Sequence, residues 1–130
     1  MNVIIVEDEK SAIKNMIALL HEIDPTISVI ASIQTISEAT KWITNNPPPE
    51  LAFFDIQLAD GHSFEIFKKT TVKFPIIFTT AYNEFALRAF KVNSIDYLLK
   101  PIKKKELVFA INKFKKINED LILKNKNFIA

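Results

Sequence analysis

The chain has 130 residues with 48% hydrophobic and 25% charged side chains, which is the composition of one globular domain of ordinary size. It has no cysteine and only two histidines, which excludes disulfides, a thiol nucleophile and a Cys/His zinc site. For the same reason, any metal is expected on oxygen ligands. A single glycine, Gly61, excludes the glycine-rich loops of nucleotide-binding folds.

The formal net charge of +2 is unevenly distributed along the chain. Residues 1–99 carry 8 Lys or Arg against 12 Asp or Glu, whereas residues 100–130 carry 9 Lys against 3 acids. A solvated amphipathic helix explains this basic tail better than a nucleic-acid surface does. No apolar run approaches the roughly 20 residues of a membrane span, and no basic leader precedes the first one, so we expect a cytoplasmic protein without membrane contact.

The first half of the chain predicts two units of a strand followed by a helix. Residues 3–6 are a continuous apolar run, and after the turn Glu7-Asp8-Glu9 a helical spacing of apolar residues ends at Asp24-Pro25. Residues 28–33 are rich in β-branched side chains and predict a second strand. Ser37 fits the N-cap of a second helix. The apolar face of that helix is formed by Ala39, Trp42 and Ile43.

The second half continues the alternation after the break Pro47-Pro48-Pro49. Residues 51–54 are apolar at every position, as in a strand buried on both faces. The elements predicted after it are a loop over 57–62, a third helix containing Phe64, Ile66 and Phe67, a strand over 76–78, a fourth helix over 84–92, a strand over 95–99 and a fifth helix over 103–121. The inward face of the fifth helix is predicted to be Leu107, Ile111, Phe114 and Leu121.

Five strands that alternate with five helices predict an α/β fold. Parallel strands need crossover connections, and these are almost always right-handed, so the helices cover both faces of one parallel sheet. We expect a doubly wound, flavodoxin-like sheet of five strands in the order 2-1-3-4-5. In such sheets ligands bind beyond the carboxyl ends of the strands, here at the switch point between strands one and three.

Three carboxylates are predicted to meet at that edge of the sheet. Glu7 and Asp8 follow the first strand, and Asp55 follows the third. Crowded carboxylates repel one another unless a cation neutralises them, and Mg²⁺ suits two or three carboxylates with waters better than Ca²⁺ does. The plain alternative is a solvated acidic loop. The third acid, distant in sequence from the other two, favours the metal site.

A cation and hydroxyls follow the remaining strands. Lys100, before Pro101, ends the fifth strand, and Thr79 and Thr80 end the fourth. A lysine and a hydroxyl suit the oxygens of a phosphoryl group, although a Lys-Pro pair often only begins a loop. The set predicts phosphoryl transfer to a carboxylate, with Asp55 as the nucleophile.

These motifs, taken in order, resemble the receiver domains of bacterial two-component response regulators. The resemblance covers residues 1 to about 120 and rests on Val6-Glu7-Asp8-Glu9, on residues 54–61 around Asp55 and Gly61, on Thr80-Ala81, on Tyr97 and on Lys100-Pro101. It implies that a sensor histidine kinase phosphorylates Asp55 with the help of Mg²⁺. The implied ligands are Asp8 and Asp55 directly, Glu7 through water and the backbone carbonyl of Gln57.

The resemblance also implies how the switch works. Thr80 and Lys100 would hold the phosphoryl oxygens, Thr80 and Tyr97 would move on phosphorylation, and Gly61 and Pro101 would have structural roles. Glu7 stands where the family more commonly has Asp, which implies weaker but not abolished Mg²⁺ binding. Gln57 and Tyr82 occupy positions at which the family varies, and are expected to tune the lifetime of the phosphate.

The segments 80–90 and 96–101 resemble, in particular, receivers joined to a LytTR-type (LytR/AlgR-type) DNA-binding domain. This implies a receiver domain over residues 1–122 and the start of a linker over 123–130, with DNA contacted only by an absent C-terminal domain. It also implies a homodimer through the face of helix four, strand five and helix five. Phe85 or Phe90, if exposed on helix four, would belong to that face.

Two other functions fit parts of the same pattern. A Mg²⁺-dependent phosphohydrolase also has an aspartate nucleophile after a strand, but usually carries a second Asp two residues later, where this chain has Gln57. A pseudo-receiver would bind partners without taking phosphate, and the presence of Asp8, Asp55, Thr80 and Lys100 argues against it. His62, close to Asp55 in sequence, is expected to cap or begin the third helix rather than to act as a base or a phosphorelay histidine.

Overall fold

The fold is a five-stranded parallel sheet with helices on both faces. The computed structural model describes residues 1–82 and 94–129, with side chains up to residue 123. The strands are β1 (Asn2–Val6), β2 (Ser28–Ile33), β3 (Leu51–Asp55), β6 (Ile76–Thr80) and β7 (Ser94–Leu99). They pair in the order β2-β1-β3-β6-β7, every pair parallel, which confirms the predicted order 2-1-3-4-5.

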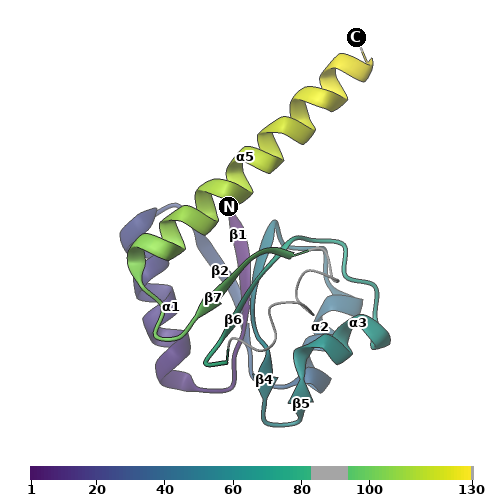
Figure 1. Cartoon of the computed structure of the whole chain (residues 1–130). Coiled ribbons are helices and arrows are strands. Elements are labelled where there is room, and N and C mark those ends of the chain that lie inside the picture. The colour runs from purple at the N-terminus through teal and green to yellow at the C-terminus, as the bar shows by residue number, and fades with distance from the viewer. Residues whose placement is uncertain (83–93, 130) are drawn as a thin grey trace.

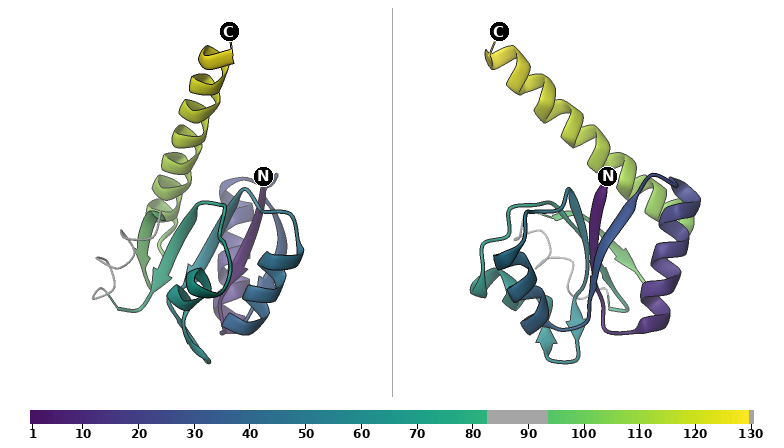
Figure 2. Two further views of the ribbon diagram at one scale, coloured as in Figure 1. Left: turned by 90° about the vertical axis from the view of Figure 1, so that its right-hand side faces the viewer. Right: turned by 180° about the vertical axis from the view of Figure 1, so that it is seen from behind.

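The described helices lie on both sides of this sheet. They are α1 (Lys10–Ile23), α2 (Ile36–Asn45), the 3₁₀ turn η1 (Ser63–Glu65), α3 (Ile66–Lys69) and α5 (Lys104–Ile129). Figures 1 and 2 show α1 and the first half of α5 against one face, and α2 and α3 against the other. None of the helices in these two stretches combines the length and the apolar sequence that crossing a membrane requires. The predicted fourth helix over 84–92, with Phe85 and Phe90, lies outside the described residues.

Two apolar layers hold the helices to the sheet. Because successive strand residues point to opposite faces, Ile4 and Phe54 pack on the side of α2 and α3, whereas Ile5 and Phe53 pack on the side of α1 and α5. All five residues of β3 are buried, as expected of a strand covered on both faces. This arrangement fixes the positions at which the strands end, and therefore the positions of the residues that follow them.

The structure corrects three local predictions in the first two-thirds of the chain. The N-cap of α2 is Thr35 rather than Ser37, and its hydroxyl accepts the N–H of Glu38 at 3.1 Å. The predicted loop over 57–62 contains a short antiparallel hairpin of β4 (Gln57–Leu58) and β5 (Gly61–His62). The predicted third helix is only η1 followed by the four residues of α3, and His62 stands at the N-cap of η1, as expected.

The fifth helix is longer than predicted. It continues through Ile129 instead of ending near Leu121, and residues 104–129 contain no glycine or proline that would stop it. Leu107, Ile111 and Phe114 are buried as predicted. Leu121 is 55% exposed, so its assignment to the inward face was wrong. The reason is visible in Figure 1, where the last turns of α5 extend past the end of the sheet.

We predict that Phe54→Ala strongly destabilises the domain. Phe54 is fully buried, and its ring lies 6.3 Å from the rings of Phe67, Phe74 and Phe78, measured between centroids. Removing it should lower the free energy of unfolding by about 3–5 kcal/mol in urea titrations, because it leaves a cavity among these rings. The control Phe109→Ala, at a side chain 68% exposed, should change it by less than about 0.5 kcal/mol. Equal effects of the two substitutions would contradict this packing.

Candidate functional site

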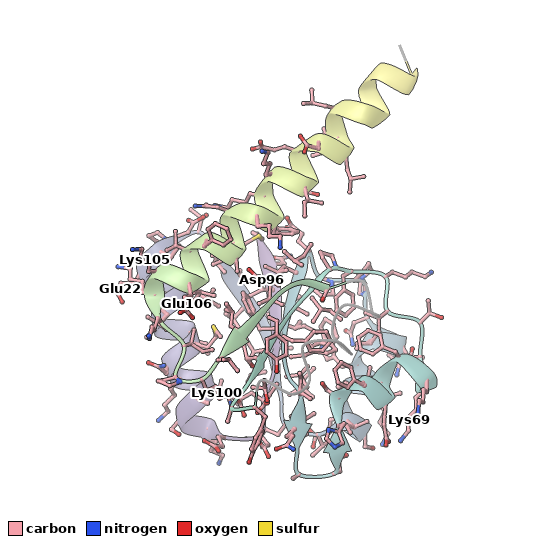
Figure 3. All side chains as sticks on the ribbon, viewed as in Figure 1. Glu22, Lys69, Asp96, Lys100, Lys105 and Glu106 are labelled. Carbon is pink, nitrogen blue, oxygen red and sulfur yellow. The ribbon has the colours of Figure 1, made fainter. Side chains whose placement is uncertain are left out.

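The chemically active side chains gather where the parallel strands end. Glu7 follows β1, Asp55 and Thr80 are the last residues of β3 and β6, and Lys100 follows β7. The strand register brings them level, because Asp55 pairs with Thr79 and Thr80 pairs with Leu99. Figure 3 shows Lys100 at the end of the sheet that carries the β4–β5 hairpin, away from the projecting end of α5. The structure therefore brings these predicted site residues together at one edge of the sheet.

Lys100 joins two of the acids. Its Nζ lies 2.5 Å from Oε1 of Glu7 and 3.0 Å from Oδ2 of Asp55, and these residues are only 5% and 6% exposed. Burial alone lowers the pKa of Lys100, but its hydrogen bonds to Glu7 and Asp55 outweigh burial and raise the pKa above the ordinary lysine value. The ammonium therefore stays charged, and it offsets part of the negative charge held at this edge.

Asp8 completes a cluster of three acids. One carboxylate oxygen each from Glu7, Asp8 and Asp55 lie within 4.8 Å of one another. Burial raises the pKa of Asp8, and a hydrogen bond with Glu7 and the charge of Glu7 raise it further. The donors are all oxygens, which hard divalent cations prefer, so the cluster can hold a metal ion. Asp8 and Asp55 border a cavity of about 310 Å³ that is also lined by Gln57, Thr80, Tyr82 and Lys100.

The structure distinguishes the two threonines that sequence alone left equivalent. Thr80 is fully buried and lines the cavity with Asp8 and Asp55, and its Oγ1 accepts the N–H of Tyr82 at 3.2 Å. Thr79 is also buried, but it borders a separate cavity beside α1. Adjacent strand residues point to opposite faces, so only one of the two threonines lines the cavity that holds Asp8 and Asp55. That residue is Thr80, the one that the family motif names.

Gln57 and Pro101 are chain neighbours of the site residues, and Gly61 lies on the hairpin strand that pairs with the strand of Gln57. The N–H of Gln57 donates to Oδ1 of Asp55 at 3.2 Å, so both oxygens of Asp55 have partners, Oδ1 from Gln57 and Oδ2 from Lys100. Gly61 has φ +136°, a conformation that other residues rarely adopt. The Lys100–Pro101 peptide bond is cis.

Tyr97 is connected to the site through Tyr82. The hydroxyl of Tyr97 donates to the backbone carbonyl of Tyr82, and the N–H of Tyr82 donates to the hydroxyl of Thr80. Tyr97 is half-buried and packs against the apolar layer on the side of α2 and α3. Two hydrogen bonds on one residue therefore link the buried threonine of the site to an aromatic side chain of β7.

Sequence reasoning missed the role of Asp60. Its carboxylate accepts the N–H groups of Ile36 and Ser37, at 2.9 Å and 3.2 Å, at the start of α2. The hydrogen bond from Ile36 holds the pKa of Asp60 below its usual value, so the carboxylate is charged near neutral pH. Asp60 was noticed only as part of the motif around Asp55. Its partners lie 23 and 24 residues earlier, so no local pattern could reveal the contact.

Comparison with known proteins agrees with this geometry. A family model described as the response regulator receiver domain matches residues 3–112. The sensory transduction protein LytT of Bacillus anthracis is 34% identical over 125 residues, which cover 94% of this chain and 50% of that protein. The sensory transduction protein LytR of Staphylococcus haemolyticus is 36% identical over 118 residues, covering 88% of this chain and 45% of that protein. The chain thus spans about half the length of these relatives.

A solved structure gives the same result for the fold. The response regulatory domain of protein mrkE from Klebsiella pneumoniae superposes with a TM-score of 0.81 at 26% sequence identity. The match covers 92% of this chain and 99% of that one, so it includes the sheet and the helices that position the acid cluster.

We predict that Asp8→Asn stabilises the metal-free domain. Burial and the neighbouring Glu7 disfavour the charged form of Asp8, so a neutral amide removes an unfavourable interaction from the folded state. Because Asp8 is partly open to solvent, the gain in the free energy of unfolding should stay below about 1 kcal/mol. Urea titration in buffer with a chelator measures it. The control is Glu9→Gln at the exposed neighbouring residue, which should leave the free energy of unfolding unchanged. If Asp8→Asn lowered the free energy of unfolding, the electrostatic explanation would be contradicted.

Proposed function

The chain belongs to the response regulator receiver domain family, and on this premise we propose that Asp55 accepts a phosphoryl group from a sensor histidine kinase with the help of Mg²⁺. The observation that carries the proposal is the position of Lys100, whose ammonium touches both Glu7 and Asp55 beside the third acid, Asp8. Such a site offers a nucleophilic carboxylate, a place for a divalent cation and a fixed positive charge. Phosphoryl transfer requires these three features.

The metal ligands in this proposal are those implied by the family motif. Asp8 and Asp55 supply carboxylate oxygens, Gln57 supplies its backbone carbonyl, and Glu7 acts through water. Bound Mg²⁺ would offset the negative charge of the phosphoryl oxygens during transfer.

The transfer itself is a substitution at phosphorus. A carboxylate oxygen of Asp55 forms the new bond to phosphorus while the bond to the donor nitrogen of a phosphohistidine breaks, and the electron pair returns to the imidazole, which then takes up a proton. Lys100 releases Asp55 and stabilises the charge on the phosphoryl oxygens, to which the hydroxyl of Thr80 also donates. The N–H of Gln57 orients the carboxylate before the reaction through its hydrogen bond to Oδ1.

We propose that a movement of Tyr97 transmits the effect of phosphorylation to the protein surface. If Thr80 turns towards a phosphoryl oxygen, it releases the N–H of Tyr82, and the carbonyl of Tyr82 no longer fixes the hydroxyl of Tyr97. An inward turn of Tyr97 would then alter the surface of β7 and α5, where Leu99 and Phe109 are exposed. We propose that this surface forms a homodimer, together with the segment predicted as the fourth helix.

The relatives suggest the setting of the switch. The sensory transduction proteins LytT and LytR are about twice as long as this chain. Their extra length supports the proposal that a LytTR-type DNA-binding domain follows a linker that starts near residue 123. In the described residues this stretch continues α5 as a helix. DNA would be contacted only by that further domain, and the whole protein would act in the cytoplasm, where a kinase can reach Asp55.

We predict that acetyl phosphate adds one phosphoryl group to the wild-type domain only when Mg²⁺ is present. Intact mass spectrometry measures the adduct. Asp55→Asn should abolish it, whereas the control Asp96→Asn, an acid on β7 that lies outside the cluster, should leave it unchanged. An adduct that persists in Asp55→Asn would contradict the assignment of the nucleophile. No adduct would favour a pseudo-receiver, and rapid multiple turnover of a general phosphatase substrate would favour a phosphohydrolase.

We predict that the phosphate mimic beryllofluoride increases the apparent mass of the domain in size-exclusion chromatography, as expected for a dimer. Phe109→Ala should weaken this dimer by about tenfold or more, because a large exposed apolar side chain at the proposed interface is lost. Ile30→Ala removes an exposed apolar side chain from β2, at the opposite edge of the sheet, and should have no effect. A dimer that depends on Ile30 instead would contradict the proposed face.

A further inference from the structure

The hairpin that follows Asp55 is attached to α2 by two independent contacts. The first is the pair of hydrogen bonds from the N–H groups of Ile36 and Ser37 to the two carboxylate oxygens of Asp60. The second is a close approach at Gly61, where an added Cβ would lie 3.2 Å from Cδ1 of Ile36. Ile36 is buried, so it cannot easily move away. Hairpin and helix therefore have little freedom to shift relative to each other.

The hairpin carries Gln57 on its other strand. Gln57 pairs with His62, and Leu58 pairs with Gly61, so the position of the second strand fixes the backbone of the first. Before the hairpin, the N–H of Ile56 donates to the carbonyl of Thr79 at 3.0 Å, which ties the chain to β6. The side chain of Gln57 is exposed and gives its own backbone little packing. The contacts of Asp60 and Gly61 with α2 thus hold the far end of the segment that contains the Gln57 carbonyl.

We infer that Asp60 is a positioning residue for the metal site: by anchoring the hairpin to the first turn of α2, it holds the backbone carbonyl of Gln57 where a divalent cation bound by Asp8 and Asp55 requires it. This inference rests on the proposed function, because it assumes that the Gln57 carbonyl binds Mg²⁺. A metal ligand that is already held in place loses less conformational freedom when the metal binds. Mutation of residues that hold metal ligands commonly weakens metal affinity by about 10- to 100-fold.

The alternative is that Asp60 only caps α2. A carboxylate at a helix N-terminus stabilises the helix by accepting unpaired N–H groups, and Asp60 does so here. Thr35 caps the same turn through the N–H of Glu38 but belongs to the chain before α2, not to the hairpin. Thr35→Ala is therefore a matched control, since it weakens the same end of the same helix and leaves the hairpin contacts in place.

The test measures Mg²⁺ affinity by isothermal calorimetry on the whole 130-residue chain, with wild type, Asp60→Ala, Asp60→Asn and Thr35→Ala. Urea titration first establishes that each variant is folded at the temperature used. We expect Asp60→Ala to raise the Kd for Mg²⁺ about tenfold or more. Asp60→Asn, which keeps one acceptor oxygen, should have a smaller effect, and Thr35→Ala should leave the Kd within about twofold of wild type.

A second variant approaches the same contact from the other side. Gly61→Ala retains both caps of α2 but places a methyl group against Ile36 and requires an unfavourable φ, so it should displace the hairpin and also raise the Kd. Hydrogen exchange gives a further readout, because a hairpin held by bound Mg²⁺ should slow exchange of the Ile36 and Ser37 amides in wild type and not in Asp60→Ala.

The possible failures are distinguishable. An unchanged Kd in Asp60→Ala, or equal changes in Asp60→Ala and Thr35→Ala, would overturn the positioning role and leave the proposed phosphorylation switch intact. A wild-type chain that binds no Mg²⁺ would instead overturn the proposed function, and this inference with it.

Discussion

The Lys100 ammonium lies between two carboxylates that are largely removed from water, and the rest of the site depends on that contact. Glu7 and Asp55 come from the ends of β1 and β3, and Lys100 follows β7, so the three groups meet only if the whole sheet has formed in register. Buried charges without partners are strongly destabilising, whereas here each has an opposite charge within 3.0 Å. The sheet thus assembles the site, and the ion pairs keep the edge of the sheet from being a cluster of unpaired acids.

Lys100 neutralises the charge of the three acids only in part, so the cluster can still accept a cation. One lysine faces three carboxylates, and burial together with the neighbouring Glu7 raises the pKa of Asp8. In the proposed function Mg²⁺ supplies that missing charge, and the phosphoryl group then brings negative charge that both Mg²⁺ and Lys100 can offset. Such a site changes its internal contacts when it is loaded, and the chain from Thr80 through Tyr82 to Tyr97 is one path by which the change can reach β7.

The sequence predicted the fold and most of the site because both follow from the strands. β1 and β3 are apolar at nearly every position, and the three acids, Thr80 and Lys100 all lie at the last residue of a strand or within two residues after it. Strand order alone therefore brings these residues together. The contacts that sequence could not predict join distant segments. Asp60 accepts hydrogen bonds at the start of α2, and the hydroxyl of Tyr97 donates to the carbonyl of Tyr82. The exposure of Leu121 was also missed, because it depends on α5 continuing past the sheet. Ser37 and Thr35 are both good capping residues, and only the exact start of α2 decides between them.

The most direct test of the site formed by the three acids, Thr80 and Lys100 is a crystal structure of the domain with Mg²⁺ and beryllofluoride. We predict an ion about 2.1 Å from oxygens of Asp8, Asp55 and the Gln57 backbone, with the beryllium bonded to Asp55. We also predict that the Lys100 ammonium has left Asp55 and contacts a fluoride. An ion bound away from Asp8 and Asp55, or a Lys100 side chain that still pairs with Asp55 and makes no contact with the fluoride, would contradict these predictions.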